Sequence, residues 1–249
     1  MEIPKPSLII IPGAWQQVTA FQNFVNILVK EGFSAEAIKL PSVGSTSAPP
    51  LPGLAEDIAA AQRAITQAVD KSQEVILICH SYGGLVGSNA AEGLDIHTRS
   101  KQGKAGGIKK IIFLSAFVIP RGKSLFEMIG QPLPWMEVHD DKISAKKEMV
   151  AEIGFNDLSP ENVAEACDKM THSSASIFVT PSMYEPWTNG VSCDYILTTE
   201  DNALSYPLQE NMAKQLGSNS NSVILKSGHN PFLSMPDKLL EAIITLSKK

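Results

Sequence analysis

The strongest candidate for chemistry in this chain is Ser81, which lies where a buried strand is predicted to turn into a helix. Residues 75–79 are all apolar, and the chain then runs HSYGG over residues 80–84. A serine on such a sharp turn exposes its hydroxyl at the end of a sheet and is typical of a nucleophile in acyl transfer. The positions two before and two after the serine must be small. They are Cys79, where glycine is usual, and Gly83.

A serine hydroxyl needs a base within hydrogen-bond reach, and the base needs an acid that orients it. Of the five histidines, His229 is the one that follows a late strand-like run, in the segment SGHNP of residues 227–231. In α/β folds that carry a serine nucleophile on such a strand-to-helix turn, the chain order is nucleophile, acid, base. We therefore predict that His229 is the base.

The acid is expected between these two residues, at the end of the strand predicted over residues 193–198. Glu200 and Asp201 both stand there, and Asp201 is favoured because aspartate is the commoner acid in this role. The acid of such a triad can instead follow the preceding strand. After that predicted strand, however, no carboxylate occurs before Glu127, and this also supports Asp201.

Two backbone N–H groups are predicted to stabilise the oxyanion that forms during acyl transfer. One belongs to Tyr82, directly after the nucleophile. The other belongs to Ala14, in the loop PGAW of residues 12–15 after the first strand, where Gly13 permits a close turn.

Short β-branched runs alternate with helical patterns along the chain, which indicates a mostly parallel sheet with helices on both faces. We predict strands and helices over the following residues: strands 8–11, 34–40, 75–79, 108–117, 193–198 and 222–226, and helices 18–30, 54–69, 82–91, 204–216 and 236–246.

The alternation stops between residues 118 and 190, and this segment is predicted to be a helical cap inserted after the fourth strand. Residues 1–117 and 191–249 would then form the core. Short helices are expected near 124–129 and 160–170. A cap over the carboxyl ends of the strands covers the edge where open α/β sheets bind ligands. Aromatic and methionine side chains of the cap are expected to line an apolar pocket, and we name Phe126, Met128, Trp135 and Trp187. Trp15, in the loop after the first strand, is predicted to line the same pocket.

Composition narrows the function. The 249 residues are 43% hydrophobic and 19% charged with a net charge of −5, which is typical of a globular domain and gives no basic patch for nucleic acid or membrane. Three widely spaced cysteines predict neither a disulfide framework nor a metal site and favour a cytoplasmic setting. The apolar run at residues 7–11 is too short for a signal peptide or a membrane span.

The motifs PGAW, HSYGG, TED and GHNPF, in this order, resemble those of small α/β hydrolases such as plant methylesterases, hydroxynitrile lyases and bacterial and fungal esterases. The resemblance covers nearly the whole chain apart from the cap. It implies the α/β-hydrolase fold, a triad of Ser81, Asp201 and His229, oxyanion donors at Ala14 and Tyr82, and no cofactor. The chain departs from the family at Cys79 and at Pro12, where histidine is usual.

Hydrolysis of a small to medium, largely apolar ester or lactone is the leading interpretation. Hydroxynitrile lyases of this family carry threonine at the position of Gly13 and lysine at that of Asn230, which argues against cyanohydrin cleavage. Two alternative functions remain: a non-hydrolytic lyase or cyclase that uses the same triad, and a ligand receptor with slow turnover. The expected partner is a small-molecule substrate; a homodimer is compatible with the sequence, which leaves the oligomeric state open.

Overall fold

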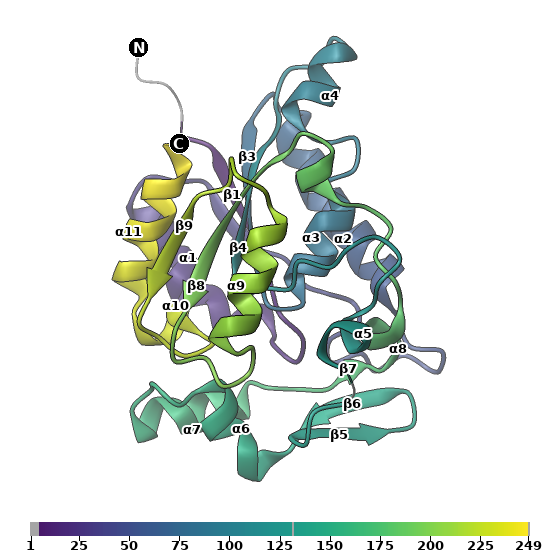
Figure 1. The fold of residues 1–249 in the computed structure, drawn as a ribbon, viewed down its shortest axis with the longest axis vertical. Helices are drawn as coiled ribbons and strands as arrows, with labels where there is room; N and C mark the ends of the chain where they lie inside the picture. The colour runs from purple at the N-terminus through teal and green to yellow at the C-terminus, as the bar shows by residue number, and fades with distance from the viewer. Residues whose placement is uncertain (1–4, 131, 249) are drawn as a thin grey trace.

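A computed structural model describes residues 5–130 and 132–248, so residues 1–4 and 249 of the predicted core and residue 131 of the predicted cap lie outside it. Six parallel strands form the central sheet, in the order β2-β1-β3-β4-β8-β9. This confirms the predicted parallel α/β architecture (Figure 1). The strands are β1 Ser7–Ile11, β2 Ala35–Ala37, β3 Glu74–His80, β4 Gly107–Leu114, β8 Ser192–Thr198 and β9 Ser222–Leu225.

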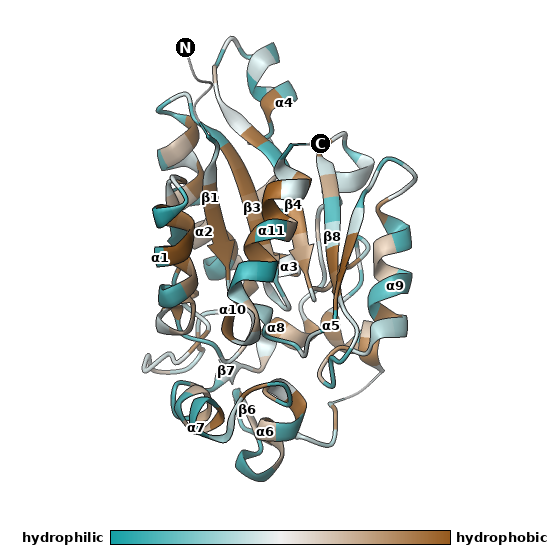
Figure 2. Cartoon of the chain, turned by 90° about the vertical axis from the view of Figure 1, so that its left-hand side faces the viewer, coloured by the Kyte–Doolittle hydropathy of each residue, from teal (hydrophilic) through white to brown (hydrophobic). Residues whose placement is uncertain are grey.

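Both faces of the sheet are buried, because alternate residues of the central strands point to opposite sides and most are apolar. Figure 2 shows β1, β3 and β4 as mostly hydrophobic strands. In β3, Leu77 and Cys79 join one core, which also takes in α2, α3 and α9. Ile76 and Ile78 join the other, which takes in α1 and α11. The helices of the two layers are η1 Val18–Phe21, α1 Gln22–Lys30, α2 Leu54–Val69, α3 Gly83–Ala90, α4 Ile96–Lys101, α9 Tyr206–Gln215, α10 Pro231–Ser234 and α11 Pro236–Ser247.

The segment between β4 and β8 supplies a cap that lies across the end of the core (Figure 1). The expectation that this cap is helical is wrong in part, because it also contains a three-stranded antiparallel sheet, β5-β6-β7. Met136 and Val138 alternate with polar residues, and Asp140, at a φ of 49°, turns the chain into the next strand. This hairpin pattern is visible in the sequence. The cap elements are α5 Leu125–Ile129, β5 Met136–His139, β6 Lys142–Ala145, α6 Lys147–Gly154, α7 Pro160–Asp168, β7 Ser173–Ser174, α8 Ser176–Val179 and η2 Pro186–Thr188.

Among the described residues, no helix is both long enough and apolar enough to cross a lipid bilayer.

Candidate active site

Ser81 lies on a strained turn between β3 and α3. Its φ is 52°, in the left-handed region that non-glycine residues rarely adopt. The strain is held by hydrogen bonds on both sides: the Ser81 N–H donates to Leu114 O at 3.3 Å, and Ser81 O accepts from Phe117 N at 3.1 Å. Such strain is found where the surrounding structure fixes the conformation, often at active sites. The neighbouring strands β3 and β4 therefore hold this serine at the carboxyl edge of the sheet.

Close approach of backbone explains both glycines that follow Ser81. A Cβ atom on Gly83 would lie 2.1 Å from Ile11 O, and one on Gly84 would lie 2.2 Å from Phe117 O. Neither backbone oxygen can yield as a flexible side chain could. The turn thus packs directly on the ends of β1 and β4, as the sequence prediction of small residues requires.

Cys79, the departure before the serine, is accommodated by a missing side chain on the next helix. It is fully buried, and a Cβ atom on Gly87 of α3 would lie 2.3 Å from its Sγ atom. The sulfur occupies space that an alanine at Gly87 would fill. The thiol of Cys79 therefore fits beneath the helix because residue 87 is glycine.

The structure brings His229 and Asp201 together in a buried pair. Nδ1 of His229 lies 2.7 Å from Oδ2 of Asp201, and both residues are more than nine-tenths buried. Because a carboxylate can only accept, Nδ1 carries the proton and donates. Nε2, the other ring nitrogen, is then free to face the pocket that Ser81 also lines. Glu200, the alternative acid, instead pairs with Lys226 at 3.6 Å.

The Asp201 carboxylate is oriented by several further donors. Oδ1 accepts from the backbone N–H groups of Ala203 and Leu204, both at 2.8 Å. Oδ2 accepts from Thr198 Oγ1 at 3.1 Å and from Gln209 Nε2 at 3.0 Å. Gln209 is buried in α9, and nothing in the sequence motifs pointed to it. Both carboxylate oxygens are therefore fixed in place relative to His229.

His80 supports the base from below, a role that sequence reasoning missed. Its Nε2 donates to the backbone carbonyl of His229 at 2.9 Å, and the two rings lie 4.7 Å apart. Burial, together with the neighbouring His229, lowers the pKa of His80 well below its usual value. His80 is thus a neutral donor that links the loop of His229 to the turn that carries Ser81.

The predicted oxyanion donors, Ala14 and Tyr82, line the same pocket as Ser81 and His229. Within the described part of the chain, neither backbone N–H donates to a protein acceptor. The Ala14 loop follows Pro12 and is held by Trp15, whose φ is 64°. Trp15 donates from its backbone to Ser173 Oγ at 2.8 Å and from its ring to Ile143 O at 2.7 Å. The cap therefore fixes this loop.

The hydroxyl of Tyr82 reaches the other way, to a buried carboxylate. It donates to Oδ2 of Asp57 in α2 at 2.7 Å, and Ser42 donates to the same carboxylate from its backbone at 2.9 Å and from its hydroxyl at 2.5 Å. Burial raises the pKa of Asp57 to about 6. Asp57 therefore anchors the residue whose N–H is a candidate oxyanion donor.

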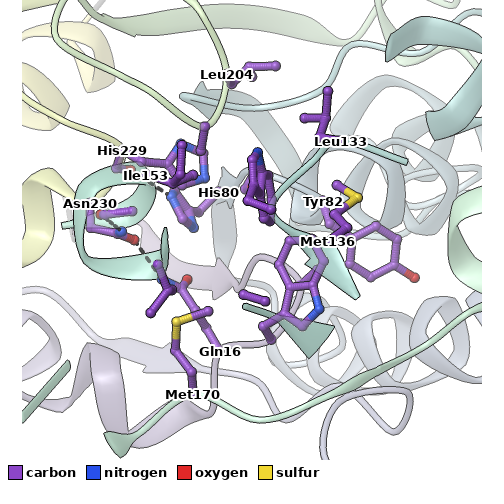
Figure 3. Close-up of a pocket in the computed structure, with 18 of the residues that line it drawn as sticks. Gln16, His80, Tyr82, Leu133, Met136, Ile153, Met170, Leu204, His229 and Asn230 are labelled. Atoms are coloured by element: carbon purple, nitrogen blue, oxygen red, sulfur yellow. Dashed lines mark hydrogen bonds between the residues drawn. The ribbon is translucent and has the colours of Figure 1, made fainter. Parts of the chain in front are cut away.

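The pocket above Ser81 has a volume of about 720 Å³, including its open side. Core and cap both contribute walls, and most of the lining side chains are apolar (Figure 3). From the cap and the neighbouring core loops these include Leu125, Ile129, Leu133, Met136, Val150, Ile153, Phe155, Met170 and Leu204.

Of the five predicted pocket residues, Trp15 and Trp135 line it, and their rings meet edge to face at 5.2 Å. The prediction is wrong for the other three, which do not line this pocket. Phe126 stacks on Phe178 within the cap, and Met128 packs against the core on the same short helix, α5. Trp187 contacts Phe113 on the face of the sheet. Helix α5 presents Leu125 and Ile129 to the pocket instead.

Cap residues also hold the loops that carry Asp201 and His229. Asp157 accepts from the Gly228 N–H at 2.7 Å, next to His229. Asn156 donates to Glu200 O at 2.8 Å, next to Asp201. The cap segment that follows α6 thus contacts both triad loops.

Known proteins resemble this chain in sequence and in fold. The model of the "Alpha/beta hydrolase family" matches residues 8–242. The alpha/beta hydrolase nvfD of Aspergillus novofumigatus is 29% identical, over 96% of this chain and 95% of that protein. A pyrethroid hydrolase of Sphingobium faniae has a similar structure, with a TM-score of 0.78 and 22% identity over 98% of this chain and 97% of that one. Polyneuridine aldehyde esterase gives a TM-score of 0.77 and 17% identity, over 98% and 100%. These structural likenesses show a shared fold.

Proposed function

Because the chain belongs to the alpha/beta hydrolase family, we propose that it is a serine hydrolase that cleaves a small to medium, largely apolar carboxylic ester or lactone. The observation that carries this proposal is the buried pair of His229 and Asp201, at 2.7 Å, in one pocket with the strained Ser81. The names of the hydrolases and the esterase to which the chain is similar support it further.

In the proposed reaction, Ser81 Oγ attacks the substrate carbonyl while Nε2 of His229 takes the hydroxyl proton. Asp201 keeps the other ring nitrogen protonated and stabilises the imidazolium that forms. The N–H groups of Ala14 and Tyr82 donate to the tetrahedral oxyanion. His229 then returns the proton to the leaving alkoxide. Water, activated by the same histidine, hydrolyses the acyl-enzyme.

The first experiment compares wild type with Ser81→Ala on p-nitrophenyl acetate and butyrate. We expect kcat to fall at least about 1,000-fold, because the remaining oxyanion donors and binding contacts supply only residual catalysis. An active-site phosphonate should add one equivalent of mass to wild type and none to the variant.

The control is Ser220→Ala, which removes a serine hydroxyl from the turn before β9, outside the pocket. It should match wild type. A wild type without turnover or phosphonate labelling, or a Ser81→Ala protein that is equally active, would contradict the acyl-enzyme. A lyase or a receptor would then be the better hypothesis.

A further inference from the structure

Gln16 places a polar acceptor in the largely apolar wall of the pocket. The residue is only 7% exposed and lines the pocket. Its Oε1 atom is buried and has no hydrogen-bond partner in the part of the chain that the structure describes. Buried carbonyl oxygens nearly always find a donor, because leaving one unpaired costs its full desolvation. Gln16 therefore holds an unused hydrogen-bond acceptor in a residue that lines the pocket.

A chain of hydrogen bonds determines which end of the Gln16 amide is left unpaired. The Gly154 backbone carbonyl accepts from Asn230 Nδ2 at 2.6 Å. Because that carbonyl can only accept, Asn230 must turn its Oδ1 toward Gln16, where it accepts from Nε2 at 2.6 Å (Figure 3). The Gln16 amide is thereby held with its NH₂ on Asn230. The unpaired end is an acceptor and cannot donate.

We propose that Gln16 Oε1 determines substrate specificity by accepting a hydrogen bond from an O–H or N–H group of the substrate. The inference rests on the proposed function and narrows it to a largely apolar ester that carries a hydroxyl or amide donor away from the scissile carbonyl. An ether or ketone at that point offers only an acceptor oxygen, which cannot form a hydrogen bond with Oε1 and is repelled by it. A site built to bind a donor rejects the analogue that lacks it.

Access to Oε1 requires a small local movement, because the atom is closed to water. The neighbouring wall is Met170, whose backbone pairs with that of Gln16 and whose side chain lines the same pocket (Figure 3). Methionine is unbranched and adapts its shape readily. Binding of a substrate donor to Oε1 therefore requires this part of the wall to move.

The test uses p-nitrophenyl esters of butanoic and 3-phenylpropanoic acid. Each parent is compared with hydroxylated forms (3-hydroxy on butanoate, meta- and para-hydroxy on the ring) and with their methyl ethers. In wild type, we expect at least one hydroxy ester to exceed its ether in kcat/KM by about tenfold or more. In Gln16→Met the ratio should fall to near one. Gln22→Met, which changes an exposed glutamine of α1, should keep the wild-type ratio.

A second readout separates this inference from the hydrolase proposal. The inactive Ser81→Ala protein is titrated calorimetrically with the same esters, with and without Gln16→Met. Tighter, Gln16-dependent binding of a hydroxy ester supports the inference even if wild type turns nothing over. Turnover of all the esters, with no Gln16-dependent preference in either assay, overturns it and leaves the hydrolase standing. If Gln16→Met fails to fold by circular dichroism, Asn230→Ala replaces it, because the freed amide can then turn and the ratio should fall.

Discussion

At the scale of single residues, the burial of Asp57 makes the stability of the protein depend on the protonation of its carboxyl group. Its carboxyl is fully buried in α2 and accepts three hydrogen bonds, yet desolvation still raises its pKa from 3.8 to about 6. The folded protein then binds a proton here more tightly than the unfolded chain does. This group therefore makes stability fall as the pH rises through the window from about 4 to about 6.

We predict that Asp57→Asn removes this dependence. The free energy of unfolding of the variant minus that of wild type should rise between pH 4 and pH 7 by roughly 2–3 kcal/mol, the equivalent of the shift. Urea titrations at several pH values measure it. Asp140→Asn, at an exposed turn, should give a flat difference. A flat or falling difference for Asp57→Asn would contradict the argument.

At the scale of elements, the cap and the triad loops form one hydrogen-bonded unit. The segment that ends α6 and leads into α7 contacts the loops after β8 and β9 by four hydrogen bonds. The donor and acceptor pairs are Asn156 to Glu200, Gly228 to Asp157, Asn230 to Gly154 and Asn202 to Glu152. The oxyanion loop is fastened to the cap sheet by Trp15. A cap in this position does more than cover the pocket, because it restrains the residues that carry the base and the acid.

From this we predict that Asp157 positions the base. Asp157→Ala leaves the Gly228 N–H without its partner next to His229, and kcat should fall by about tenfold, since small displacements of a catalytic group are costly. Asp157→Asn keeps an acceptor oxygen and should restore most of the rate. Steady-state kinetics on p-nitrophenyl butyrate measure both. Glu161→Ala, at an exposed site of α7, serves as the cap control. An unchanged kcat in folded Asp157→Ala would refute the positioning role.

At the scale of the whole molecule, a buried ion pair stabilises the sheet at a distance from the candidate active site. Lys110 of β4 pairs with Asp194 of β8 at 2.5 Å, and both side chains are buried on the face covered by α11. Neither residue lines the active-site pocket. Asp194 also accepts from the Asn221 backbone. The ion pair therefore links β4, β8 and the C-terminal helix α11, and it lies away from Ser81 and His229.

Lys110→Met should lower the free energy of unfolding by about 3–5 kcal/mol, because it leaves the buried Asp194 carboxylate without compensation. The KM of the folded protein should not change. Lys109→Met removes an exposed pair with Glu74 and should cost at most about 1 kcal/mol. Urea denaturation and KM measurements distinguish the two variants. A raised KM with unchanged stability would show that the pair serves the pocket instead.

Much of the fold could be predicted because its signals are local. The apolar run of β3, the glycines after Ser81 and the helix at Leu54–Val69 are each coded within a short window. The cap was harder to predict. Its hairpin strands are short, and its sheet is completed by a two-residue strand far along the chain, Ser173–Ser174. The prediction of which α5 side chains line the pocket was also wrong, because the sequence of a five-residue helix does not reveal which of its sides faces the core.

The sequence by itself predicted the turn that carries Ser81, the candidates for base and acid, and the parallel sheet that brings them to one edge. Each depends on neighbouring residues and on the rule that parallel strands end together. Only the tertiary structure decided that Asp201 rather than Glu200 meets His229. It alone placed His80 beneath the base and Gln209 beside the acid. It also left Gln16 with an unpaired acceptor. These contacts join segments many residues apart, and their geometry follows from packing that no local pattern encodes.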